Sequence, residues 1–223
     1  MSLWIKICGN TSLKDARLAV EAGAYAVGFV FAPSPRRVSA AEVAAIVPHL
    51  PAAVEKIGVF VDASLSEIYS TVRECGLTGV QLHFEAGPEA PAKLRARLGP
   101  KLRVLRVVHF DAGTPDRTAD QIGLLAQDGH VDAVLVDSRT ATSIGGTGVK
   151  FDWSAARRTV FGDGARLKLV VAGGLNPENV AEAVALLKPW GVDVVSGVES
   201  APGRKEPIKV RAFVARARAM ERV

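Results

Sequence analysis

Two side chains able to transfer protons stand at the ends of short apolar segments of the sequence. Cys8 ends segment 4–8, and Asp137 ends segment 132–137. At such a position Cys8 could serve as a nucleophile or a base, and Asp137 could serve as an acid. Each also has a simple structural interpretation, because a lone cysteine is often a small buried apolar residue and a carboxylate after an apolar run can cap the next turn.

Lys6 lies two residues before Cys8, and alternate residues of a strand point to the same face. Its ammonium group should therefore favour the thiolate form of Cys8. Cys75 lies near the end of a predicted helix, and we interpret it as a buried structural residue.

Two turns rich in small residues suggest a site for phosphate. Gly173 and Gly174 follow the apolar segment 167–172, and Ser196 and Gly197 close the segment 192–196. Glycines where a buried strand ends let backbone N–H groups approach a ligand closely. Two such turns on neighbouring parallel strands would form a cup that binds a phosphate group.

Further polar residues follow other apolar segments. Arg36 and Arg37 form either an exposed basic turn or a guanidinium fork for a carboxylate, which arginine suits better than lysine. Asp62 could cap a helix, and His83 could be a hydrogen-bonded residue at the rim of the site. The long loop 138–150 contains three glycines, Gly145, Gly146 and Gly148, and its expected mobility suits a lid.

The composition is that of an ordinary globular protein, and its modest positive charge could reflect an anionic substrate, nucleic acid or only solubility. The 223 residues include 48% hydrophobic and 23% charged residues, and the formal net charge is +5. We expect no nucleic-acid binding, because the basic residues in 93–97 and 211–222 read as solvated helix faces. Two distant cysteines indicate neither a disulfide framework nor a zinc site. No signal peptide or membrane-spanning run is visible, so a cytoplasmic location is expected.

The elements that must position these residues alternate regularly between strand and helix. Short segments rich in Val, Ile and Leu are typical of buried parallel strands, and we predict eight: 4–8, 25–31, 54–61, 79–83, 102–108, 132–137, 167–172 and 192–196. This pattern predicts an α/β protein whose residues 1–223 form a single (β/α)8 TIM barrel domain. A doubly wound open sheet is the alternative, but its G-x-G-x-x-G fingerprint is absent from the first turn, Cys8-Gly9-Asn10.

Motifs along nearly the whole chain resemble those of the phosphoribosylanthranilate isomerase family of tryptophan biosynthesis. They are KICGNTSLKDA at 6–16, AVGFVFAPSPRRVS at 26–39, IGVFVDAS at 57–64, GVQLH at 79–83, VLVDS at 134–138, GGTGVKFDWS at 145–154, GGLNPENV at 173–180 and VDVVSGVESAPGRK at 192–205. Each motif alone is weak, and their shared order makes the resemblance specific.

The resemblance implies an Amadori rearrangement of N-(5-phosphoribosyl)anthranilate to 1-(2-carboxyphenylamino)-1-deoxyribulose 5-phosphate. It implies Cys8 as the base, Asp137 as the acid and Arg37 as the ligand of the substrate carboxylate. It assigns the phosphate to Gly173, Gly174, Ser196 and Gly197. The implied partner is a phosphorylated small molecule, with no metal or organic cofactor and no membrane, and the protein is expected to be a monomer or a homodimer.

Three residues depart from the family pattern without touching the proposed acid or base. Phe84 follows the QLH motif where glycine is usual, Ala172 stands where serine is common, and Glu206 replaces aspartate. One alternative function is another phosphate-binding barrel isomerase, such as the histidine-pathway Amadori isomerase. That family uses a pair of aspartates, and the presence of Cys8 argues against it. The other alternative is a barrel without activity that serves as a binding module.

Overall fold

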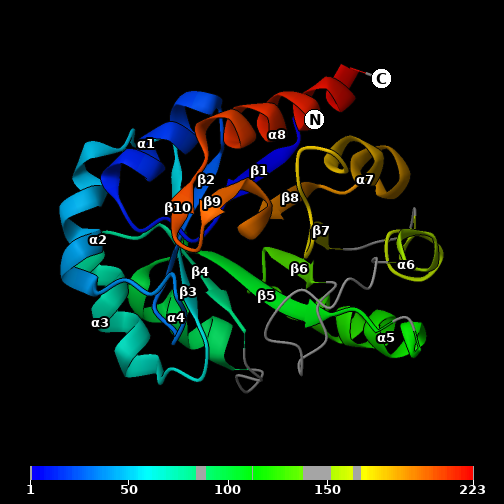
Figure 1. The fold of residues 1–223 in the computed structure, drawn as a ribbon. Coiled ribbons are helices and arrows are strands. Elements are labelled where there is room, and N and C mark those ends of the chain that lie inside the picture. Colours follow the sequence, from blue (N-terminus) through cyan, green and yellow to red (C-terminus); the bar gives the residue numbers. More distant parts are fainter. Residues whose placement is uncertain (1, 84–88, 112, 138–151, 163–166, 223) are drawn as a thin grey trace.

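Eight parallel strands close into a barrel in chain order, with β1 paired to both β2 and β8 (Figure 1). The computed structural model describes residues 2–83, 89–111, 113–137, 152–162 and 167–222. The barrel strands are β1 Trp4–Ile7, β2 Ala26–Val30, β3 Glu55–Phe60, β4 Gly79–Leu82, β5 Arg103–His109, β6 Ala133–Asp137, β7 Lys168–Ala172 and β8 Gly191–Val194. The closed parallel barrel confirms the predicted TIM-barrel fold.

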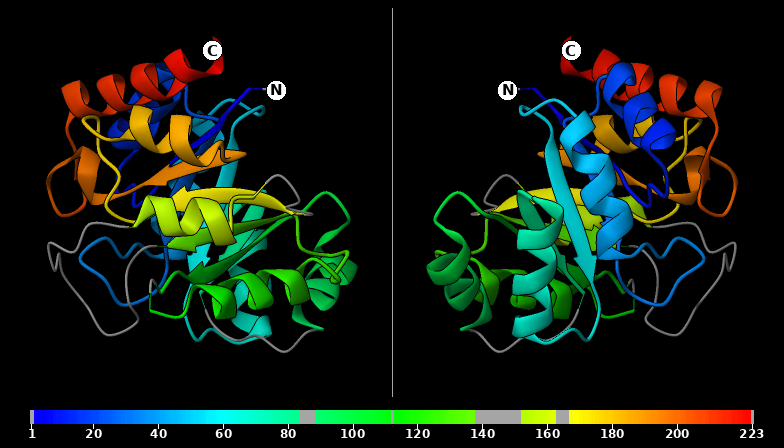
Figure 2. Two further views of the ribbon diagram at one scale, coloured as in Figure 1. Left: turned by 90° about the vertical axis from the view of Figure 1, so that its right-hand side faces the viewer. Right: turned by 90° about the vertical axis from the view of Figure 1, so that its left-hand side faces the viewer.

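Helices surround the strands on the outside of the barrel, as two opposite views, each at right angles to that of Figure 1, show (Figure 2). Within the described residues these α-helices are α1 Leu13–Ala22, α2 Ala40–Ile46, α3 Leu65–Cys75, α4 Ala90–Leu98, α5 Pro115–Leu125, α6 Trp153–Thr159, α7 Val180–Leu187 and α8 Pro207–Ala219. A small antiparallel hairpin, β9 Glu199–Ala201 and β10 Arg204–Lys205, follows β8. No helix in these described segments is both long and apolar enough to cross a membrane.

Local capping signals explain where several helices begin. Ser39 and Ser64 each accept a hydrogen bond from the backbone of a glutamate three residues later, and that glutamate bonds back to the serine N–H. Such a capping box satisfies two backbone donors at the helix start. The predicted cap Asp62 is wrong, because Ser64 caps α3 while Asp62 adopts a left-handed φ of 54°.

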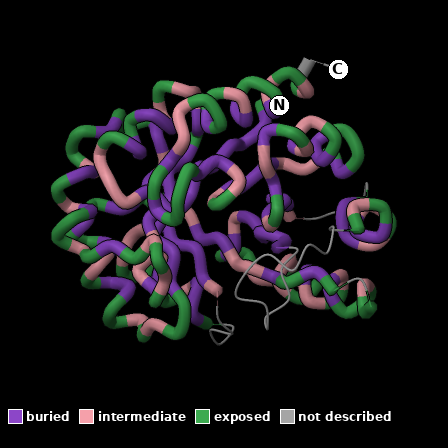
Figure 3. The backbone as a smooth tube through the Cα atoms, viewed as in Figure 1, coloured by how far each residue is buried: buried purple, intermediate pink, exposed green. Residues whose placement is uncertain are grey.

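The core has two layers that meet at the strands, which are mostly buried on both faces (Figure 3). The outer layer lies between strands and helices. The inner layer fills the barrel with alternate strand residues: Trp4, Ala26, Ile57, Leu105, Ala133, Leu135, Val170 and Ala172. Because side chains alternate along a strand, residues two positions beyond these members also point into the barrel.

The amino-terminal ends of the strands are closed by aromatic and charged side chains. Trp4 and Trp190 stack with ring centroids 5.1 Å apart, and Lys168 Nζ lies 4.9 Å from the Trp190 ring. Arg103 forms a 2.6 Å ion pair with Glu55 beside them. These side chains pack against one another at the amino-terminal ends of the strands, whereas barrel enzymes hold their substrates at the carboxyl ends.

Candidate active site

Cys8 directly follows β1 and lies at the carboxyl end of the barrel. Its backbone N–H donates to Val194 of β8 at 2.9 Å, and the residue is 3% exposed. The thiol lies over Gly28 of β2, where an added Cβ would come within 2.5 Å of Sγ and 3.0 Å of the Lys6 Cε. Only glycine leaves room for both side chains at this point.

Lys6 lies inside the barrel, one layer below Cys8, and its side chain is fully buried. Its Nζ donates to Gln81 Oε1 and to Asp193 Oδ1, each at 2.8 Å. Burial alone would lower the pKa of Lys6, but the Asp193 carboxylate and Cys8 outweigh it and raise the pKa. Lys6 is thus an ammonium group held beneath the thiol.

The pKa of the Cys8 thiol is raised, chiefly because burial disfavours the thiolate. Lys6 and Lys205 oppose this by favouring the charged form, whereas Asp193 adds to it. The expectation that Lys6 favours the thiolate is correct, because Lys6 lowers the pKa of Cys8. The net pKa of Cys8 is nevertheless raised. Desolvation of the thiol exceeds the attraction of the ammonium group.

Gln81 links Lys6 to His83 at the rim. Since Gln81 Oε1 accepts from Lys6, its amide nitrogen faces His83 Nε2, 2.8 Å away. That nitrogen can only donate, so His83 Nε2 must accept and carries no proton. This confirms the expectation of a hydrogen-bonded rim residue.

Asp137 is the last residue of β6 and is 8% exposed. Leu135, two residues earlier, belongs to the interior layer, so Asp137 points toward the barrel axis at the carboxyl end. Its strand is separated from β1 by β7 and β8. Cys8 and Asp137 can therefore approach a substrate at the mouth from different sides.

The two neighbouring arginines have different environments. Arg36 binds Glu199 through Nε–Oε1 at 2.9 Å and Nη2–Oε2 at 2.7 Å, and its Cδ lies against Gly9. The pKa of Arg36 is raised, chiefly by the hydrogen bonds to Glu199, and Cys8 also contributes. Arg37 is exposed, and its side chain forms no hydrogen bond or ion pair within the described part of the chain. Arg36, rather than Arg37, thus lies toward Cys8.

The two turns predicted to hold phosphate lie side by side. Gly173 and Gly174 have left-handed φ values of 81° and 66°, which favour glycine. An added Cβ at Gly197 would collide with the Leu175 carbonyl oxygen, whereas one at Gly174 would meet nothing within 4 Å. The second turn thus packs against the first, and the space beside Gly174 is open. Ser196 is exposed beside it.

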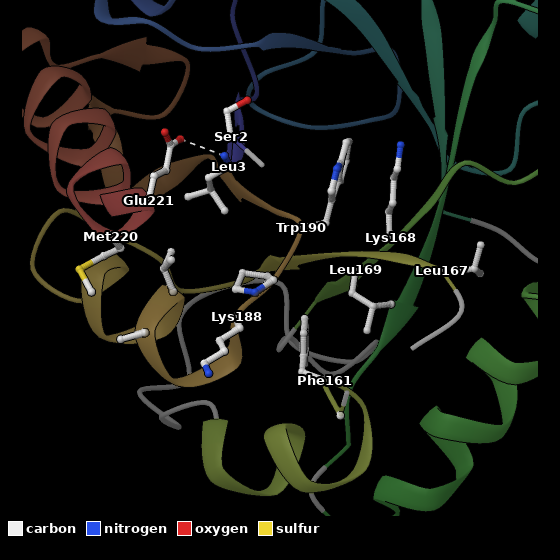
Figure 4. Close-up of a pocket in the computed structure, with 14 residues that line it drawn as sticks. Ser2, Leu3, Phe161, Leu167, Lys168, Leu169, Lys188, Trp190, Met220 and Glu221 are labelled. Carbon is white, nitrogen blue, oxygen red and sulfur yellow. Dashed lines mark hydrogen bonds between the residues drawn. The ribbon is translucent and has the colours of Figure 1, made fainter. Parts of the chain in front are cut away.

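A large cavity lies at the other end of the barrel, away from these residues (Figure 4). It is lined by residues where β1, β7 and β8 begin, including Leu3, Lys168 and Trp190. Leu3 N–H donates to Glu221 Oε1 at 2.9 Å there, which brings the two chain ends together. This end of a barrel serves stability more often than chemistry, and we do not place the reaction in it.

Several polar residues of the site were not recognised in the sequence: Gln81, Asp193, Glu199 and Lys205. Asp193 offered a signal, because it interrupts the apolar segment 192–196 and a charge in a buried strand needs a partner. The predicted lid 138–150 and Phe84 lie outside the described residues. Within the described ranges no cluster of three or more His, Cys, Asp or Glu side chains could hold a metal ion.

Known proteins resemble this chain over almost its full length. A family model described as N-(5'phosphoribosyl)anthranilate (PRA) isomerase matches residues 5–216. A relative from Citrifermentans bemidjiense, named N-(5'-phosphoribosyl)anthranilate isomerase, is 45% identical over 96% of both chains. A crystal structure of monomers of the dimeric phosphoribosylanthranilate isomerase from Thermotoga maritima matches with a TM-score of 0.78 at 34% identity, over 97% of this chain and 99% of that chain.

Another solved structure includes a bound ligand. It is a phosphoribosylanthranilate isomerase in complex with reduced 1-(o-carboxyphenylamino)-1-deoxyribulose 5-phosphate. Its TM-score is 0.80 at 34% identity, over 97% of this chain and 99% of that chain.

Proposed function

The chain belongs to the N-(5'-phosphoribosyl)anthranilate isomerase family, and we propose that Cys8 is its general base and Asp137 its general acid. The protein is an isomerase of tryptophan biosynthesis that carries out an Amadori rearrangement of N-(5'-phosphoribosyl)anthranilate. The observation that supports the assignment is the position of these two buried groups. Both stand at the carboxyl ends of barrel strands, where barrel enzymes hold their reacting atoms.

Asp137 acts first, as the acid that opens the sugar ring. Its proton goes to the ring oxygen as the bond between this oxygen and C1 breaks. The nitrogen lone pair then forms a C1–N double bond, and Asp137 is left as a carboxylate. A carboxyl group held at the barrel mouth delivers this proton without waiting for solvent.

Cys8 acts second, as the base at C2. Its thiolate removes the C2 proton, the electrons of that bond form a C1–C2 double bond, and the C1–N double bond becomes a single bond. Tautomerisation of this enol, in which C1 gains a proton and the C2 hydroxyl loses one, yields the ketose product. Lys6 stabilises the thiolate from below while its own charge is balanced by Asp193.

We assign the substrate carboxylate to Arg36, although the motif pattern pointed to Arg37. Arg36 lies against Gly9, the residue after Cys8, and Glu199 holds its guanidinium in one orientation. Glu199 engages Nε and Nη2, which leaves Nη1 for a ligand. The phosphate at the other end of the substrate is proposed to bind the turns of Gly173, Gly174, Ser196 and Gly197.

Replacing the two arginines separately tests this choice. Arg36→Ala is expected to raise KM by about 10–100-fold, because a charged hydrogen bond contributes about 1.5–3 kcal/mol. Arg37→Ala should change KM by less than about threefold, since surface charges contribute little. Steady-state kinetics measure both. Arg36→Lys, which keeps the buried partner of Glu199, should give an intermediate KM. A larger increase in KM for Arg37→Ala than for Arg36→Ala would show instead that Arg37 binds the substrate carboxylate.

The proposal extends to the working state of the enzyme. We propose a cytoplasmic protein that acts without a metal or organic cofactor, as a monomer or a homodimer. The dimeric relative from Thermotoga maritima makes the homodimer a reasonable expectation. Ultracentrifugation of the purified protein distinguishes the two states.

A direct assay tests the function itself. Purified protein should consume the fluorescent anthranilate substrate, and the loss of fluorescence should depend on enzyme concentration. The same protein is also assayed with the substrate of the corresponding histidine-pathway isomerase. Turnover of that substrate alone would overturn the assignment to tryptophan biosynthesis.

A further inference from the structure

The hairpin formed by β9 and β10 packs over the turns that follow β1 and β2. Thr11 Oγ1 donates to the Gly203 carbonyl at 2.6 Å. A Cβ added to Gly203 would lie 3.3 Å from the Pro35 carbonyl oxygen. The hairpin thus reaches from the end of β8 to the turns that hold Cys8 and Arg36 (Figure 1).

Lys205 of this hairpin uses all three donors of its ammonium group within the site. Its Nζ donates to the Cys8 carbonyl at 2.5 Å, to Glu199 Oε1 at 3.1 Å and to the Val195 carbonyl at 3.3 Å. The side chain is 0% exposed. The buried ammonium group of Lys205 therefore links the backbone of Cys8, the proposed base, to the backbone of Val195, which precedes Ser196.

Glu199 completes the connection to Arg36. Its carboxylate accepts three hydrogen bonds from Arg36 and one from Lys205, and Oε1 also accepts from the Gly203 N–H at 3.3 Å. Its side chain is 4% exposed. Burial lowers the pKa of Lys205 while Glu199 opposes that effect, and the pKa of Glu199 is itself lowered despite burial because Arg36 and Lys205 favour the carboxylate.

We propose that Lys205 and Glu199 are positioning residues that hold the base, the carboxylate-binding arginine and the phosphate turn in one fixed arrangement. Neither residue touches the substrate in this proposal, which rests on the roles proposed above for Cys8 and Arg36. Lys205 acts through the Cys8 and Val195 carbonyls, and Glu199 acts through Lys205 and Arg36.

A purely stabilising role is a weaker explanation of the same contacts. Burying a charged pair costs desolvation, and well-packed apolar residues often stabilise a fold as well or better. The three hydrogen bonds of Lys205, to two backbone carbonyls and one carboxylate, instead fix the positions of these groups relative to one another. A displacement of a reacting group by about 1 Å can cost about 10²-fold in rate.

Lys205→Met is the first test, because methionine keeps the length of the side chain and removes the ammonium group. We expect kcat to fall by about 10²-fold with KM changed by less than about threefold, since Arg36 keeps its bonds to Glu199. Arg204→Met is the matched control, as it removes an exposed charge from the neighbouring position of the hairpin, and its kinetics should equal those of the wild type.

Combining Lys205→Met with Cys8→Ala separates positioning from general damage. If Lys205 acts through Cys8, its replacement should change the residual rate of Cys8→Ala by less than about threefold. Equal losses in both backgrounds would overturn the proposal. Glu199→Gln should raise KM by about tenfold in addition to lowering kcat, because it also releases Arg36.

Folding and function are controlled separately. Thermal melting by circular dichroism should show cooperative unfolding well above the assay temperature for each variant. A variant with a lower melting temperature but wild-type kcat and KM would show that the pair only stabilises the fold. If the wild-type protein itself failed to turn over the anthranilate substrate, the proposed function would fall instead, and the comparison of variants would not be needed to show it.

Discussion

Replacing Cys8 by alanine is expected to lower kcat by about 10²–10⁴-fold, the usual contribution of a positioned general base. Alanine removes the group that takes the C2 proton and leaves the surrounding backbone contacts in place, since Cys8 is held through its N–H and carbonyl. Single-turnover and steady-state fluorescence assays measure the loss. Cys75→Ala, which changes a cysteine buried against the Ala40 carbonyl, is the control and should keep wild-type kcat.

The protonation of Cys8 gives an independent measurement. Because burial raises the pKa of this thiol despite Lys6 and Lys205, the working thiolate should be a smaller fraction of the enzyme near neutral pH than for an ordinary cysteine, and this fraction should grow as the pH rises. The difference in thiolate absorbance between wild type and Cys8→Ala removes the contribution of Cys75, whose own pKa is raised to about 11. A midpoint at or below the ordinary value of about 8.5 would contradict this expectation.

Near-normal turnover in Cys8→Ala would remove Cys8 from the mechanism altogether. In that case another group would have to remove the C2 proton. Lys6 could not replace the thiolate in this role, because its raised pKa keeps it an ammonium group, which has no lone pair to accept a proton.

Asp137→Asn is expected to lower kcat by a similar factor, about 10²–10⁴-fold. Asparagine keeps the shape of the side chain but cannot release and regain the proton that opens the ring. The same fluorescence assay measures it, with circular dichroism to verify the fold. Asp116→Asn is the control, because Asp116 is an exposed residue of the first turn of α5, and its activity should equal that of the wild type.

A substrate with deuterium at C2 distinguishes the ring-opening step from the removal of the C2 proton. If Asp137 serves only ring opening, that step should limit kcat of Asp137→Asn, and deuterium at C2 of the substrate should not change this kcat. In Cys8→Ala, where removal of the C2 proton is slowed, deuterium at C2 should lower kcat. An equally large deuterium effect in Asp137→Asn would move Asp137 to a different step. Wild-type kcat in this variant would exclude it as the acid.

Local patterns in the sequence determined most of the fold. Short buried strands alternate with capped helices, and signals such as Ser39 with Glu42 act over three residues and need no tertiary partner. Strand ends in a parallel barrel meet at one rim, so Cys8 and Asp137 could be assigned to the same mouth once eight strands were counted. Asp62 was misread because an aspartate two residues before Ser64 competes as a cap, and only the backbone shows which residue caps α3.

Contacts between distant residues decided the arrangement within the site. Arg36 and Arg37 are neighbours of identical type, and what distinguishes them is that Glu199, 163 positions away, binds Arg36. Lys6 likewise depends on Gln81 and Asp193, which are 75 and 187 positions from it. No local pattern records such pairings, because they exist only after the barrel has closed.

The direction of the pKa shift of Cys8 also could not be predicted from the sequence. Spacing in the chain identified Lys6 as its neighbour, and that attraction is present. The extent to which closure of the barrel removes water from the thiol is a property of the whole fold, and this desolvation determines the direction of the pKa. The sequence by itself thus determined the barrel and the types of reactive group at its mouth. Tertiary structure decided which of them face one another and how far water is excluded, since both depend on long-range packing.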